Sequence, residues 1–176
     1  MNVIHSIDAY VLRSMQRRCG YSTEATTTAL TTLKEEQQLR KQGLHTERTV
    51  NEINQPHHVY MERYEASRMV DAVMIPHLNE DTVRDLSDMH IIKLIGLCDL
   101  LLTHKPFDII CIHDEFKSHP NNCNQMRKHY IEIFAELAES TILEDIFMQV
   151  CGRKPTYENK DACLPALIRE SEYPLS

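Results

Sequence analysis

The stretch FDIICIHDEFKSHPNNCNQMR, residues 107–127, brings a short apolar run directly before a group of ionisable side chains. Ile109–Ile112 follow Pro106, are rich in β-branched residues and are too few for a typical helix, which favours a short buried strand. The triplet His-Asp-Glu at 113–115 ends this run, and a second short strand is expected after it. We therefore predict an antiparallel β-hairpin over about residues 107–119.

The rest of the chain predicts helices, so the expected fold class is α+β and mostly helical, with the hairpin packed on helices. Only four Gly and no Trp occur among the 176 residues, and apolar residues recur at intervals of three and four over several segments. The expected helices cover residues 4–19, a long polar segment at 23–43, and about His58 to Met74. A helix from Asn79 or Asp81 to Pro106 is expected to have an inner face formed by Val83, Leu86, His90, Leu94, Leu97 and Leu101. A helix after Asn121 or Asn122 is expected to have an amphipathic face formed by Met126, Tyr130, Ile133, Phe134 and Leu137. The last helices are expected from Thr141 to Gly152, with Thr141 and Glu144 as a capping box, and for a turn or two at Cys163–Ile168.

The length and composition are those of one globular domain, or of a large piece of one. The net charge of −7 provides no overall basic field to attract nucleic acid, so contact with phosphate would need a local patch or bound cations. The six cysteines form no Cys-x-x-Cys pair, and without a signal peptide the expected location is a reducing cytoplasm. Residues 91–102 are the most apolar stretch but contain Lys93 and Asp99 and are too short to span a bilayer, so no membrane partner is expected.

A carboxylate at the end of a strand is a suitable ligand for a hard divalent cation. Asp114, with Glu115 beside it, would be held on rigid backbone, where a Mg²⁺ ion bound to Asp114 keeps open positions for substrate phosphates. The alternative is that both are turn residues and that His113 is a packed or solvated neighbour. A transition-metal site formed by His113, His119 and Cys123 is a further alternative, although their spacing matches no common zinc pattern.

Two motifs together resemble the single-subunit RNA polymerases of phages and mitochondria. IHSIDAYVLR at residues 4–13 resembles the His-Ser-x-Asp helix of that family. ICIHDEFKSHPNNCNQMRKHY at 110–130 resembles its third palm motif, in which an apolar strand ends in His-Asp before an aromatic residue, a short strand and a helix. ILEDIF at 142–147 resembles the segment after that helix. The motifs occur in the family's order, and the resemblance is confined to about residues 2–20 and 85–150.

The resemblance implies roles for residues in both motifs. Asp114 matches the family's second catalytic aspartate, which binds the Mg²⁺ ions of nucleotidyl transfer, and His113 matches the histidine beside it. His5 matches a histidine that lies near the minor groove of the template–product duplex. Ser6 and Asp8 match the companions of that histidine.

Two arginines on the first predicted helix are candidates for contact with nucleic acid. Arg13 falls where the family tends to have a basic residue, which would face phosphate. Arg17 lies four residues further on the same helix face, with Arg18 beside it. From periodicity alone, a solvated face is the simpler interpretation of these arginines.

The chain departs from the family in three respects. Residues 21–84 interrupt the match and are predicted to be a helical insertion between palm segments 1–20 and 85–152, with 153–176 as a C-terminal tail. Glu115 stands where those polymerases often have a smaller residue, and His-Asp-Glu is the usual form in family A DNA polymerases. We find neither the family's first palm aspartate nor its fingers helix, which handles the nucleotide.

These features predict a subunit or fragment of a DNA-dependent RNA polymerase, a nucleotidyltransferase that is inactive alone. A larger polymerase polypeptide would supply the fingers and the first palm aspartate. The remaining partners would be DNA template, RNA product and nucleoside triphosphates, in the cytoplasm of a host cell if the protein is encoded by a bacteriophage.

Two other functions are compatible with the residues. An HD-type metal-dependent phosphohydrolase would place His113 and Asp114 on a helix and take further ligands from His57, His58 or His77. A non-catalytic phage accessory protein could instead keep a palm remnant without binding metal.

Overall fold

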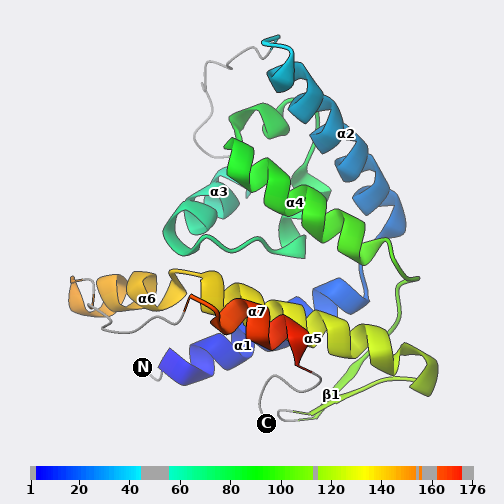
Figure 1. The fold of residues 1–176 in the computed structure, drawn as a ribbon, viewed down its shortest axis with the longest axis vertical. Coiled ribbons are helices and arrows are strands. Elements are labelled where there is room, and N and C mark those ends of the chain that lie inside the picture. The colour runs from blue at the N-terminus through cyan, green and yellow to red at the C-terminus, as the bar shows by residue number, and fades with distance from the viewer. Residues whose placement is uncertain (1–2, 45–55, 113–114, 154, 156–161, 172–176) are drawn as a thin grey trace. The chain divides into compact units, whose positions relative to one another are not determined.

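The computed structural model describes residues 3–44, 56–112, 115–153, 155 and 162–171, and this part of the chain is mostly helical (Figure 1). A short antiparallel pair of strands accompanies the helices, which confirms the predicted α+β class. The described elements are α1 (Val3–Cys19), α2 (Thr23–Lys41), α3 (Pro56–Ser67), the 3₁₀ helices η1 (Ala72–His77) and η2 (Thr82–Asp85), α4 (Asp88–Leu101), β1 (Ile110–Ile112), β2 (Glu115–Lys117), the 3₁₀ helix η3 (Pro120–Asn122), α5 (Cys123–Glu139), α6 (Ile142–Cys151) and α7 (Leu164–Glu170).

The chain folds into two compact units. Unit 1 comprises Met1–Gly20, Glu65–Met69 and Phe107–Ser176, and unit 2 comprises Tyr21–Tyr64 and Val70–Pro106. This division describes packing alone, so the palm, insertion and tail roles assigned to segments of the sequence stay predictions.

The core of unit 1 lies between α1 and α5. Met15 and Cys19 of α1 are fully buried and pack with Ile133 of α5, which is also fully buried. Asn122 is the N-cap residue of α5, although its side chain makes no capping hydrogen bond. The amphipathic face predicted for this helix is confirmed, because Ile133 is buried in the core and the other apolar residues of the face are partly buried against it: Met126, Tyr130, Phe134 and Leu137.

Helix α6 begins after its N-cap Thr141 and ends before Gly152, as predicted. Its last residue precedes Gly152, whose φ of 68° is the left-handed conformation that favours glycine. The predicted capping box is wrong, because the Thr141 hydroxyl makes no capping bond. It donates instead to the backbone carbonyl of Ala66 at 2.8 Å, so tertiary contact replaces the local cap.

Helix α7, predicted as a turn or two, lies along α5 (Figure 1). The guanidinium of Arg169 contacts the carboxylates of Glu132 at 2.7 Å and Glu139 at 2.5 Å. One cation on α7 therefore binds two anions on α5, which fixes the position of this short helix within unit 1.

A backbone hydrogen bond joins two parts of unit 1 that are far apart in the sequence. The N–H of Phe107 donates to the carbonyl of Cys19 at 2.8 Å. The end of α1 and the start of the segment that leads into β1 are therefore neighbours.

Unit 2 is built around α2 and α4. Leu33 of α2 and Leu94 of α4 are fully buried in one apolar core. The predicted long polar helix is confirmed as α2, and the oxygen of its N-cap Ser22 accepts a hydrogen bond from the N–H of Ala25 at 3.3 Å.

The helix predicted over His58–Met74 begins earlier and is shorter than expected. Pro56 starts α3, at a position where its missing N–H leaves no helical hydrogen bond unmade. Arg68 adopts a left-handed backbone conformation with φ of 61°, which ends α3. Asp71 then caps η1 by accepting a hydrogen bond from the N–H of Val73 at 3.0 Å.

The helix predicted from Asn79 or Asp81 to Pro106 is divided into η2 and α4. Asn79 accepts backbone hydrogen bonds at the start of η2, and the hydroxyl of Ser87 accepts one at the start of α4. The Ser87 cap restarts the helix, and apolar periodicity alone does not reveal it. The predicted inner face is nevertheless confirmed, because its residues are buried: Val83, Leu86, His90, Leu94, Leu97 and Leu101.

None of the described helices combines the length and the apolar character that a membrane crossing requires.

Candidate functional site

The hairpin fixes the backbone on both sides of the His-Asp pair. Strands β1 and β2 pair antiparallel, and Ile112 lies opposite Glu115. The chain between these two paired residues consists of His113 and Asp114, which lie outside the described residues. The two predicted strands are confirmed as β1 and β2, whereas the roles of His113 and Asp114 stay predictions.

One face of the hairpin is anchored in the core of unit 1. Ile109 and Phe116 pack against the buried residues of α1 and α5, and the ring of Phe116 lies 5.8 Å from that of Tyr130. The expectation of a buried strand is wrong, because Ile110 and Ile112 are 63% and 45% exposed. Alternate side chains of a strand point to opposite faces, and a two-stranded ribbon on a helical core covers only one of them.

Helix α1 places the His5 motif in the same unit as the hairpin. His5 and Asp8 are exposed and three residues apart, so they share a helix face, and Ser6 is half-buried. Arg13 is exposed and Arg17 is half-buried one turn further along. The exposed side chains of His5, Asp8 and Arg13 are accessible to a ligand, but contact of this motif with nucleic acid stays a prediction.

Arg18 contradicts the interpretation of the three arginines as a solvated face. Its side chain is fully buried, and its guanidinium donates to the carboxylate of Glu136 on α5 at 2.5 Å. The signal was present in the sequence, because Arg18 follows the buried residues Val11 and Met15 by seven and three positions. These spacings place it on the inner face of α1.

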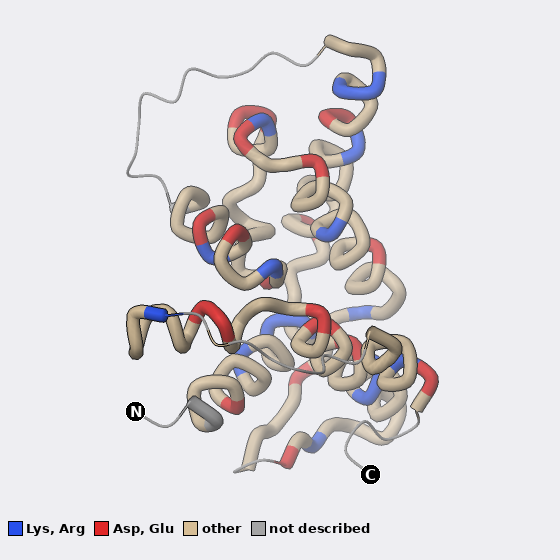
Figure 2. Tube along the Cα trace, turned by 60° about the vertical axis from the view of Figure 1, so that its left-hand side comes forward, with Lys and Arg blue, Asp and Glu red and all other residues tan. Residues whose placement is uncertain are grey.

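Lys and Arg residues are interspersed with Asp and Glu along the described helices (Figure 2). A nucleic-acid contact in either unit would therefore depend on a few particular cations rather than on a continuous basic stretch.

His119 and Cys123, the two described residues of the alternative zinc site, make other local contacts. The ring of His119 accepts a hydrogen bond from the N–H of Asn121 at 3.3 Å and so caps η3. The thiol of Cys123 lies 3.7 Å from the carbonyl oxygen of His119. These contacts account for His119 and Cys123 without a metal ion.

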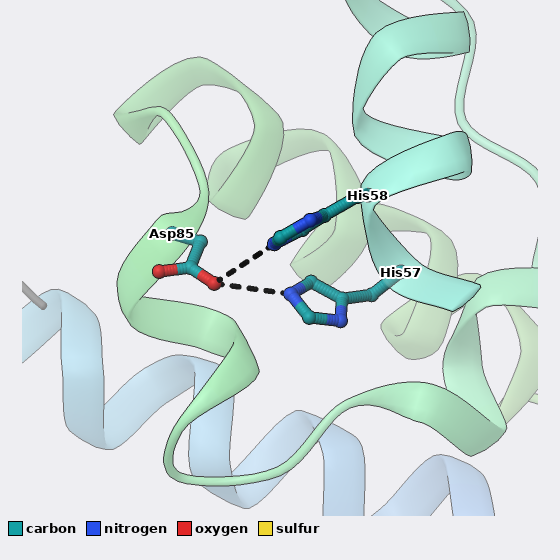
Figure 3. A group of neighbouring side chains, drawn as sticks. All are labelled: His57, His58 and Asp85. Carbon is teal, nitrogen blue, oxygen red and sulfur yellow. Dashed lines mark hydrogen bonds and ion pairs between the residues drawn. The ribbon is translucent and has the colours of Figure 1, made fainter. Parts of the chain in front are cut away.

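Among the described residues, one group of side chains has the composition and proximity to hold a metal ion, and it lies in unit 2. His57 and His58, at the start of α3, both point toward Asp85 at the end of η2 (Figure 3). Nε2 of His57 lies 3.0 Å from Oδ2 of Asp85, and Nε2 of His58 lies 3.7 Å from the same oxygen. His77, the third histidine considered, stacks instead on Tyr60 with ring centroids 5.6 Å apart.

Sequence reasoning identified both histidines of this group but missed Asp85. The adjacent pair His57-His58 after Pro56 is visible in the sequence, whereas the carboxylate comes from another element at a spacing that matches no motif. Two imidazoles and one carboxylate are typical of transition-metal sites, so the group does not test the Mg²⁺ predicted at Asp114.

No protein-family model matches the chain, and no curated protein is significantly similar to it.

Proposed function

We propose that this chain is the palm portion of a single-subunit DNA-dependent RNA polymerase, a nucleotidyltransferase in which Asp114 binds catalytic Mg²⁺. The observation that supports this function best is the backbone around the His-Asp pair. β1 precedes the pair, β2 follows it, and the amphipathic helix α5 comes next. This is the order of elements that the polymerase motif requires.

The same backbone counts against the phosphohydrolase alternative. An HD-type hydrolase would carry its His-Asp pair on a helix, whereas residues 110–112 and 115–117 are paired strands. Extended backbone on both sides favours a carboxylate presented at the rim of a hairpin.

A second observation concerns α1, which carries the motif of His5, Ser6 and Asp8. α1 packs directly on α5, and the two helices share a core with the hairpin. Both motifs of the resemblance thus belong to one packing unit, as parts of one palm would. In that arrangement His5, Ser6, Arg13 and Arg17 would contact the template–product duplex.

The proposed chemistry needs a second polypeptide or region that brings the fingers and the first palm aspartate. Mg²⁺, when bound, would stabilise the charge that develops on the attacking and leaving oxygens of the phosphoryl group. Asp114 would hold that charge centre beside the nucleoside triphosphate and the end of the RNA. Transcription of this kind would take place in the cytoplasm of a host cell.

The test is template-directed nucleotide incorporation by the chain purified with its natural partner from the cells that make it. D114N should lower incorporation at least ~10³-fold, equivalent to roughly 4 kcal/mol of transition-state stabilisation, without releasing the partner. E115Q is the matched control, because Glu115 is exposed and contacts Lys117 at 3.2 Å, so its loss should leave most activity.

Two results would decide against the proposal. If D114N retains more than a tenth of the wild-type rate, Asp114 does not hold the catalytic metal. If the wild-type chain binds its partner but the partner incorporates nucleotides equally well with and without this chain, the non-catalytic accessory function is the better description.

A further inference from the structure

The arrangement of His57 and His58 is unusual for two neighbouring residues on a helix. Adjacent side chains leave a helix about 100° apart and do not normally face each other. Here both imidazoles, with ring centroids 4.2 Å apart, direct Nε2 at one oxygen of Asp85 (Figure 3). We propose that His57, His58 and Asp85 bind a divalent transition-metal ion such as Zn²⁺, at a site separate from the proposed palm.

The distances suit such an ion after small side-chain rotations. The three ligand atoms all lie within 4.8 Å of one another. In a tetrahedral site with metal–ligand bonds of about 2.0–2.2 Å, the ligand atoms are about 3.4 Å apart. The two distances to Asp85, 3.0 and 3.7 Å, bracket this value.

A hydrogen bond to Asp85 explains the position of the His57 ring but not that of the His58 ring. At 3.0 Å the His57 ring can donate to Asp85, but 3.7 Å is too long for the His58 ring to donate to the same oxygen. A metal ion between the three groups would give both rings the same role. It would also place a positive charge beside a carboxylate that is only 7% exposed.

The ligand types select the class of metal. Imidazole nitrogen suits Zn²⁺, Co²⁺, Ni²⁺ and Cu²⁺, whereas Mg²⁺ and Ca²⁺ prefer sites made of oxygen ligands. His57 and Asp85 have side chains that are 3% and 7% exposed, and that of His58 is 17% exposed. The three described ligands leave a fourth position, which water can reach beside His58.

The metal would connect two elements of unit 2 that are separate in the sequence. His57 and His58 lie in the first turn of α3, and Asp85 is the last residue of η2. Binding would therefore hold the beginning of α3 to η2 and stabilise unit 2 against unfolding by mass action.

The experiment is titration of the full-length, chelator-treated chain with Zn²⁺, Co²⁺ and Mg²⁺, followed by calorimetry and by the visible absorption of Co²⁺. We expect one equivalent of Zn²⁺ to remain after dialysis and Mg²⁺ to fail to displace it. H58A and D85N should each lower Zn²⁺ affinity at least about 100-fold, more than the loss of an outer hydrogen-bond partner would. H77A and H119A, which remove histidines outside the group, should bind as the wild type does.

H58A keeps the test valid if the more buried ligands prove necessary for folding, since His58 is the most exposed member. Its circular dichroism should match that of the wild type while its metal binding is lost. Absence of stoichiometric binding in the wild type would overturn the proposal. So would binding that H58A and D85N leave unchanged, or binding that H119A abolishes.

Discussion

Loss of Glu136 from its ion pair with Arg18 should destabilise unit 1 more than loss of one partner from an exposed pair. The Arg18 side chain is 0% exposed and that of Glu136 is 18% exposed, and the two groups lie 2.5 Å apart across α1 and α5. E136M would leave the buried guanidinium without this carboxylate. Removal of one partner from a buried pair costs about 3–5 kcal/mol, and the partial exposure of Glu136 places the expected loss near ~3 kcal/mol.

The double variant R18M/E136M separates the charge from the packing. Replacement of both buried charges by apolar side chains of similar length is often close to neutral. We therefore expect the double variant to recover at least ~1 kcal/mol of the loss caused by E136M, a coupling typical of residues in direct contact.

Hydrogen exchange followed by mass spectrometry is the suitable assay, because it reports each unit separately. A loss of ~3 kcal/mol corresponds to exchange that is roughly 100-fold faster for the amides of α1 and α5, if they open together. Peptides from α2 and α4 in unit 2 provide the internal control and should exchange as before. The reasoning is refuted if E136M accelerates exchange less than about tenfold, or if the double variant is no more protected than E136M.

Two further predictions follow from the buried titratable groups. The pKa of His90 is lowered from 6.5 to about 4, by burial and by the nearby charge of Lys93. Between these pH values the unfolded chain binds a proton at this position that the folded chain does not. The free energy of unfolding should therefore fall as pH decreases from 6.5 to 4, by up to about 3 kcal/mol from this residue. Urea unfolding of H90F, which keeps an aromatic ring, should depend less on pH over this window, and parallel curves for the two proteins would contradict the assignment. Burial also raises the pKa of the Cys19 and Cys98 thiols to about 12. A disulfide reagent should therefore modify the exposed Cys151 quickly and those two only on unfolding, and mass spectrometry showing early modification of either would disprove their burial.

Local patterns were sufficient to predict the elements whose stability is mainly local or amphipathic. The spacing of Val11, Met15 and Cys19 and that of the α5 face identify two helices with their buried sides, because a 3.6-residue period leaves one stripe in the core. The β-branched run after Pro106 identified β1, because β-branched side chains favour extended backbone.

The errors arose where a tertiary contact or an unusual backbone conformation decided the outcome. Arg68 ends α3 in a left-handed conformation, which is rare for a residue other than glycine and is not predicted by the local sequence. Thr141 is a residue type that often caps helices, but its hydroxyl donates to the carbonyl of Ala66, which is distant in the sequence. Asp85 joins His57 and His58 only through the fold of unit 2, so no spacing rule could have found it.

The two strands of the candidate palm site were predictable from the sequence. The chemical roles of the residues between them were not, because a motif of two residues is too short to identify a function. The His-Asp pair at 113–114 is short, and many turns carry such residues. Its interpretation came from the second motif at His5, which packs in the same unit.

The hydrogen bond between Cys19 and Phe107 has a consequence for how such a chain can change in evolution. The residues between them leave and rejoin unit 1 at neighbouring points, and only Glu65–Met69 returns to it on the way. The entropy of closing a loop grows only with the logarithm of its length, so the intervening segment can be lengthened, shortened or exchanged at small thermodynamic cost. Unit 2 could therefore be exchanged as an inserted segment, because the Cys19–Phe107 bond holds the two ends of unit 1 together where that segment leaves and returns.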